Sequence, residues 1–188
     1  MAKSKKMTRQ KDNSNPYTVL AFCFADQARA GEVMKELKAS KTLEGHRVVA
    51  SAVIEVDEYG KAQAHQHGRG GVGMALGIMA GEALALIGGP AGLLVWAVVG
   101  GAVGGAAGHF VDQAFSKEDL AKLKDRMSPR SSAILTMAKD AETEGITAAL
   151  RHYQAVVVTL TLGAEAAGAV DQSVTAGAQD SGAAEKTD

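Results

Sequence analysis

The chain of 188 residues contains a single cysteine, has almost no net charge and shows no recognisable catalytic motif. Because Cys23 has no possible partner within the chain, an internal disulfide is excluded and a reducing compartment is favoured. A net charge of −1 argues against a general nucleic-acid binder. No Ser/His/Asp set and no acidic pair stands on a known motif, so we expect neither an enzyme nor a bound cofactor.

A signal peptide is also lacking. The first apolar run, Tyr17–Phe24, is too short for a signal-peptide core and has no cleavage-like site after it, so we do not expect a secreted protein. Charge gathers instead at the two ends of the chain. Five basic residues against one aspartate give +4 in residues 1–16, and five acidic residues against one lysine give −4 in residues 163–188. We expect a basic disordered arm and an acidic, Ala/Gly-rich disordered tail.

Glycine is concentrated in one segment. Residues 68–108 hold fourteen of the 22 glycines, and the only charge after Arg69 in this segment is Glu82. Positions four apart lie on one face of an α-helix, so glycines at this spacing leave a groove into which another helix fits closely. The pattern predicts an apolar, glycine-zipper helical hairpin over residues 68–110. The glycines expected at the helix–helix contact are Gly73, Gly77, Gly81, Gly100, Gly104 and Gly108.

On either side of the hairpin the sequence predicts strand–helix–strand units. Residues 17–67 form the first half, and residues 111–162 form a helix, which starts near Ser116, and the second half. Two such halves pair into an α+β sandwich of the ferredoxin-like type, a split βαβ fold with helices on one face of a single sheet. Because both halves build one sheet, we expect the two ends of the inserted hairpin to lie close together, on the same side of anything that the hairpin enters.

This arrangement resembles a bacterial family of uncharacterised predicted membrane proteins with a glycine-zipper hairpin inside a small α/β domain. The resemblance covers residues 17–162 and implies membrane association without a catalytic motif. Glu82 and the two charged tails depart from the family's pattern. The residues that carry the resemblance are the opening strand through Phe24, the strand Val53–Asp57, the glycine-rich hairpin, the helix that runs into Ser128-Pro129, and Ser131–Leu135.

The two hairpin helices are marginal as membrane spans. Val72–Ile87 has sixteen residues, which is roughly 24 Å of helix against about 30 Å of hydrocarbon. Its six Val, Leu and Ile residues favour insertion by about 0.3–0.6 kcal/mol each, whereas a central carboxylate costs roughly 2.5–3.5 kcal/mol. Glu82 is therefore expected to be a polar group within the membrane or at an interface between copies of the chain.

Four residues near the base of the hairpin are candidate metal ligands. His65 and His67 lie two apart, which places both on one face of a strand. The far end of the hairpin returns His109 and Asp112 to the same neighbourhood. Three histidines and a carboxylate could hold a zinc-like ion. We favour a polar collar of solvated side chains and expect no bound metal.

Together these features predict a non-enzymatic protein that self-associates. In the first interpretation the hairpin inserts in the cell membrane as an anchor or oligomerisation element, and the α/β domain faces the cytoplasm. The partners are then the lipid bilayer and further copies of the chain. In the alternative, the hairpins hold together a soluble, cytoplasmic homo-oligomer or compartment-like particle. A further alternative is a regulator that binds a small ligand or a metal on the sheet.

Overall fold

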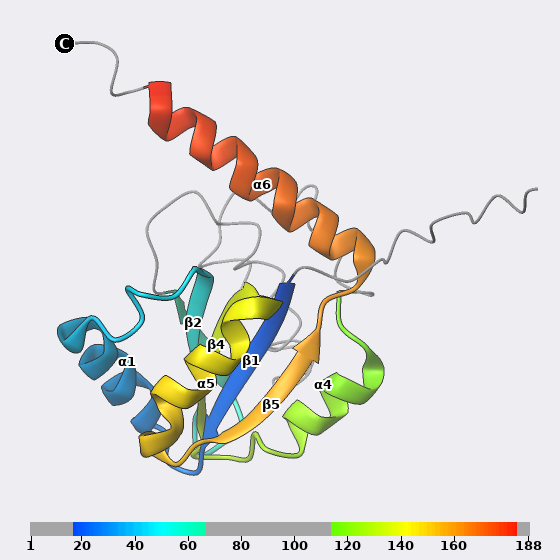
Figure 1. The fold of residues 1–188 in the computed structure, drawn as a ribbon. Coiled ribbons are helices and arrows are strands. Elements are labelled where there is room, and N and C mark those ends of the chain that lie inside the picture. Colours follow the sequence, from blue (N-terminus) through cyan, green and yellow to red (C-terminus); the bar gives the residue numbers. More distant parts are fainter. Residues whose placement is uncertain (1–16, 67–113, 184–188) are drawn as a thin grey trace, which may run out of the picture.

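A computed structural model describes residues 17–66 and 114–183. They form a mixed α+β domain, as the sequence predicts, around a five-stranded antiparallel sheet of order β3-β2-β4-β1-β5 (Figure 1). The strands are β1 (Tyr17–Phe24), β2 (Val48–Val56), β3 (Ala62–Gln66), β4 (Ser132–Lys139) and β5 (Val156–Thr161). The helices are α1 (Arg29–Ser40), α4 (Lys117–Lys124), α5 (Thr143–Leu150) and α6 (Ala164–Ala183).

The two strand–helix–strand units interleave in this sheet. Helix α1 connects β1 to β2, and α5 connects β4 to β5. The strands of each unit are not neighbours, because β4 lies between β1 and β2, and β1 lies between β4 and β5. Strands β1 and β4 therefore occupy the interior of the sheet, which explains why both are continuous apolar runs rather than alternating ones.

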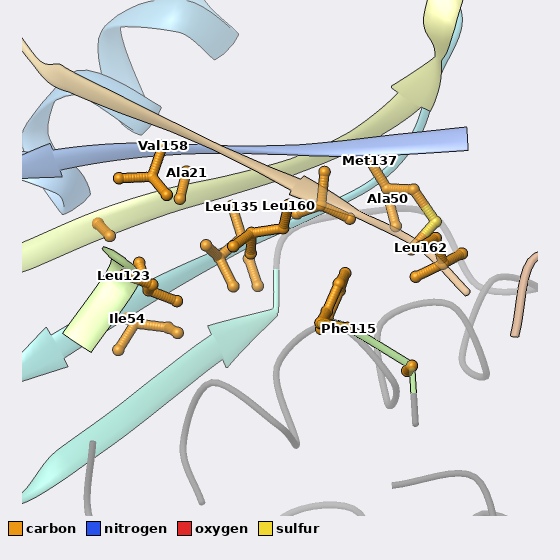
Figure 2. Packing of buried hydrophobic residues seen from close by; sticks show 14 of the residues in the cluster. Ala21, Ala50, Ile54, Phe115, Leu123, Leu135, Met137, Val158, Leu160 and Leu162 are labelled. Carbon is orange, nitrogen blue, oxygen red and sulfur yellow. The ribbon is translucent and has the colours of Figure 1, made fainter. Parts of the chain in front are cut away.

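Two hydrophobic clusters cover the two faces of the sheet. On one face, Leu20 and Phe22 of β1 pack with the apolar stripes of α1 and α5. On the other face, Val19 and Ala21 pack with residues of α4, α6 and the segment before α4. Figure 2 shows this second cluster, in which Leu123 and Phe115 lie against side chains of the sheet. The expectation of helices on one face only is therefore wrong, because α4 and α6 cover the opposite face.

Helix α6 also corrects the expected disordered tail. The chain forms a helix over Ala164–Ala183, and Ala166, Ala167 and Val170 of this helix are at most 4% exposed. These positions recur at the spacing of one helical face, and alanine has the highest helix propensity of all residues. The alanine-rich composition that suggested disorder is thus compatible with a helix once the exposed face of the sheet supplies a surface for it. Residues 184–188 lie outside the described part of the chain.

Both ends of the insertion lie at one end of the sheet, which we call the exit end. Strand β3 is antiparallel to β2, with Gln66 opposite Ala52, so β3 finishes toward the start of β2. The chain returns beside the end of β5, where Phe115 pairs with Leu162 and the Ala114 carbonyl accepts a hydrogen bond from the Gly163 N–H at 2.7 Å. The start of β1 lies at this same end, because Thr18 is opposite Thr161. In Figure 1 the exit end points upward.

Candidate functional site

Most of the residues selected from the sequence lie outside the described ranges. These are the candidate metal ligands His67, His109 and Asp112, the six zipper glycines and Glu82. The hairpin over residues 68–110 falls outside them as well. Of the four candidate metal ligands, the structure places His65 alone. His65 and the residues around it are therefore the part of this site that the structure describes.

His65 lies in the edge strand β3, opposite Val53 of β2. Its Nε2 atom is 3.9 Å from Oε2 of Glu55, and the two side chains are 52% and 29% exposed. The separation is long for a hydrogen bond, so this is a loose contact near the surface. Glu55 was not among the residues selected from the sequence. The available signal was a single charge in the otherwise apolar strand β2.

Glu55 and His65 line an open cleft of about 760 Å³ between the first turns of α1 and strands β2 and β3. Two further carboxylates, Asp26 and Glu32, line the same cleft. Gly31 of α1 faces Glu55, and a Cβ atom built at this glycine would lie 3.4 Å from Glu55 Oε1. Because Gly31 has no side chain, the Glu55 carboxylate can approach the backbone of α1 closely.

The cleft's other two carboxylates already have partners in the fold. Asp26 Oδ1 accepts hydrogen bonds from the N–H groups of Ala28 and Arg29, at 2.9 and 3.1 Å, at the start of α1. Glu32 forms an ion pair with Arg29 at 3.2 Å. Within residues 17–66 and 114–183, no group of three or more His, Cys, Asp or Glu side chains is arranged to hold a metal ion. The cleft is thus a polar groove at the surface whose carboxylates bond largely within the fold.

A buried serine fixes the position of α1 beside this cleft. The Ser132 hydroxyl donates to the Asp26 carbonyl at 2.6 Å and accepts a hydrogen bond from the Ala30 N–H at 3.0 Å. Ser132 is the first residue of β4 and is fully buried. A satisfied polar side chain at such a position sets the register between helix and sheet. Its role is structural, since both of its hydrogen bonds go to the backbone around the start of α1.

Cys23, the remaining chemically reactive side chain, is part of the core. It is 4% exposed in the cluster under α4. Burial raises the pKa of the Cys23 thiol to about 12, against a smaller opposite effect of nearby Arg126. A thiol that stays protonated at neutral pH is a poor nucleophile. Cys23 therefore acts as a small hydrophobic side chain of the core.

The fold and this cleft define a small α+β domain with helices on both faces of a five-stranded antiparallel sheet, interrupted by an insertion between β3 and α4. The chain belongs to DUF1269, a family of proteins of unknown function whose profile matches residues 71–175. This match supports the expectation of an uncharacterised family, whereas the glycine zipper and the membrane association stay predictions. The match includes the insertion, β4, β5 and the first half of α6. No curated protein and no solved structure matches the chain.

In the part of the chain that the structure describes, no helix combines the length and the apolar character needed to cross a bilayer.

Proposed function

We propose that this protein is a non-enzymatic, self-associating protein whose hairpin, residues 68–110, inserts in the cell membrane as an anchor and oligomerisation element. In this proposal the α/β domain faces the cytoplasm. The observation that carries it is the common position of Gln66 and Ala114 at the exit end of the sheet. An insertion whose two ends leave the domain at the same end can enter a bilayer and return without disturbing the sheet, so an even number of crossings is favoured.

The spacing of the two attachment points suits a helical pair. The points lie by the two edge strands β3 and β5, which are four strand spacings of about 4.8 Å apart, or roughly 19 Å. Two packed helices have axes about 8–10 Å apart. Short linkers on each side can bridge this difference. The glycines spaced by four residues supply the close contact that such a pair needs in lipid.

The basic arm adds a second argument for a bilayer. Residues 1–16, with their charge of +4, join the domain at Tyr17, which is also at the exit end. Cations near an anionic membrane surface contribute about 1 kcal/mol each. An arm attached beside the inserted hairpin is in position to contact lipid head groups.

For the domain itself we propose the ferredoxin-like arrangement. Without the short strand β3, the order of the sheet is β2-β4-β1-β5. Two interleaved strand–helix–strand units with this antiparallel order are what the split βαβ fold requires. Helices α4 and α6 then form a second layer on the face that this fold commonly leaves open.

The alternative proposal is a soluble assembly, in which hairpins from many copies pack against each other instead of against lipid. Membrane fractionation separates the two. The membrane anchor predicts that the full chain pellets with membranes and resists carbonate extraction, whereas the assembly predicts a discrete large particle that is stable without detergent. A monomer that stays in the supernatant would contradict both proposals.

The zipper is tested with Gly77→Leu and Gly104→Leu. A leucine side chain fills the groove and separates the helices, so we expect the oligomer or the membrane retention to be lost while the circular dichroism of the domain is kept. Gly45→Leu is the control, because no atom lies within 4 Å of a Cβ built at this position in the α1–β2 loop. If both hairpin variants assemble like the parent, glycine-mediated packing does not organise the protein.

Glu82 distinguishes a lipid environment from an aqueous one. A carboxylate that persists in lipid or in a protein interface needs a partner, so we expect Glu82→Leu and Glu82→Gln to change the size distribution of the oligomer. Unchanged sizes in both variants would mean that Glu82 is exposed to water. That result would count heavily against a membrane-spanning first helix.

A further inference from the structure

A second cavity lies on the same face of the sheet as the acidic cleft, at the opposite end of α1. It is an open pocket of about 260 Å³ between the last turns of α1, the α1–β2 loop and the first residues of β2. Its inner wall is apolar. Met34 and Leu37 are each 2% exposed, and Leu43 and Val48 pack partly buried against the same cluster.

The rim of this pocket carries two lysines and one carboxylate, Lys38, Lys41 and Glu44. Lys41 forms an ion pair with Glu44 at 3.6 Å, in which both side chains are about 70% exposed. Lys38 has no carboxylate within ion-pair distance in the described ranges 17–66 and 114–183. An apolar wall with an uncompensated cation above it has the polarity of a site for a chain with an anionic end.

We propose that this pocket binds a small aliphatic carboxylate, with the alkyl chain on Met34 and Leu37 and the carboxylate beside Lys38. At roughly 30 Å³ for a water-sized group in a liquid, the pocket holds about eight or nine non-hydrogen atoms. That is enough for the eight carbons of octanoate when its two carboxylate oxygens stay at the rim. Glu44 also lines this pocket, but it is held by Lys41, so the anionic end is directed to Lys38.

This site does not depend on the proposed function of the hairpin, because only described residues of α1, β2 and the loop between them build it. It also differs from the metal site predicted as a possibility from the sequence, since none of its lining residues is one of the four candidate metal ligands.

The test is titration of the full chain with octanoate, octanol and octylamine. Binding is monitored by the NMR chemical shifts of the backbone amides of Leu43 and Val48. The chain is kept in lipid nanodiscs, with empty nanodiscs as the blank, or without detergent if it assembles in water, because micelles would take up the ligand. We expect octanoate to bind more tightly than octanol, and octylamine to bind most weakly. Affinity should rise about fourfold per methylene from butanoate to octanoate and then level off where the pocket is full.

Two variants separate the parts of the site. Lys38→Gln should weaken octanoate about fivefold and leave octanol unchanged, since a rim ion pair contributes modestly. Leu43→Ala should weaken the binding of octanoate and octanol alike. Lys38→Arg, which keeps the positive charge, should bind octanoate as the parent does. Lys35→Gln is the matched control, because this lysine is on the same helix but lines the acidic cleft. Absence of octanoate binding to the parent chain, or equal effects of Lys35→Gln and Lys38→Gln, would overturn the proposal.

Discussion

The phenol of Tyr17 donates a hydrogen bond to Oδ1 of Asp171 at 2.9 Å and so joins the first residue of β1 to α6, 154 positions later in the chain. Tyr17 is 1% exposed, whereas Asp171 lies at the surface. This hydrogen bond is a polar link between the sheet and its last helix, beside the apolar contacts of Ala166, Ala167 and Val170. It is also the contact most easily tested by mutation.

We expect Tyr17→Phe to lower the free energy of unfolding by about 1 kcal/mol, and Asp171→Ala to cost somewhat more because it leaves a buried hydroxyl without its acceptor. In both variants hydrogen exchange should speed up most in residues 164–175, and in β4 it should rise by no more than the loss of global stability requires. Thr175→Ala is the control, since the Thr175 hydroxyl bonds only to the Asp171 carbonyl within α6. Equal exchange in the parent and both test variants would mean that apolar contacts alone hold α6.

Stability should fall as pH rises above about 9. Burial, the hydrogen bond to Asp171 and its negative charge raise the pKa of Tyr17 to about 12, and burial raises that of Cys23 to about 12. The ordinary pKa is near 10 for Tyr17 and near 9 for Cys23. Between these values and about pH 12, the unfolded chain loses protons that the folded chain keeps. The stabilisation is complete below pH 9 and is lost toward pH 12. The pKa of Tyr153 is raised as well, mainly by burial, and acts in the same direction.

This pH dependence is checked by denaturant unfolding at a series of pH values. The Tyr17→Phe, Cys23→Ala double variant should be less stable at neutral pH but should show a flatter decline in the alkaline range. An unchanged slope would mean that neither group is responsible for it.

A crowded contact between α5 and the α1–β2 loop predicts a coupling between Gly145 and His46. A Cβ atom at Gly145 would lie 2.6 Å from Cε1 of His46, whose Nδ1 is 3.3 Å from Glu142. Replacing a helical glycine by alanine normally gains about 1 kcal/mol. Here Gly145→Ala must displace the imidazole, so we expect the gain to appear only in the His46→Ala background.

A double-mutant cycle measures this coupling, which we expect to be about 1 kcal/mol. Gly168→Ala in α6 is the matched control, because nothing lies within 4 Å of a Cβ at Gly168. It should stabilise the protein equally with and without His46. If the Gly145 and Gly168 variants behave alike, His46 does not occupy this contact.

Cys23 should resist thiol reagents in the native protein. Because its sulfur is buried and its pKa is raised, alkylation near pH 8 should proceed at the rate of unfolding rather than at the rate of an exposed thiol. The measurement is the iodoacetamide reaction followed by mass spectrometry, with and without denaturant. Fast modification in the native protein would place the thiol at the surface.

The sequence predicts those parts of the fold whose local pattern matches their burial. Ala30, Val33, Met34 and Leu37 recur at helical spacing in the sequence, and all are at most 2% exposed in α1. Apolar and polar residues alternate toward the end of β5, where Leu160 is buried and Thr159 and Thr161 are exposed, whereas Val156 at its start is 46% exposed. The Ser116 hydroxyl accepts a hydrogen bond from the Asp119 N–H and caps α4 as expected.

The features that the sequence does not predict depend on long-range pairing. Helix α6 has an apolar face made mostly of alanine, and its anchor Tyr17 is at the other end of the chain. The contact of His65 with Glu55 requires the register of β2 against β3, which no local pattern specifies. The lysine-rimmed pocket likewise forms only when α1 docks on β2.

The strand order has a consequence for synthesis on the ribosome. Strand β1 pairs only with β4 and β5, and both lie after the insertion in the chain. When residues 67–113 leave the ribosome, β1 therefore has no partner strand. At that stage β2 and β3 are the two strands that can pair with each other. Translation must reach about residue 139 before the centre of the sheet can close. The insertion therefore leaves the ribosome attached to a nascent domain that has yet to fold.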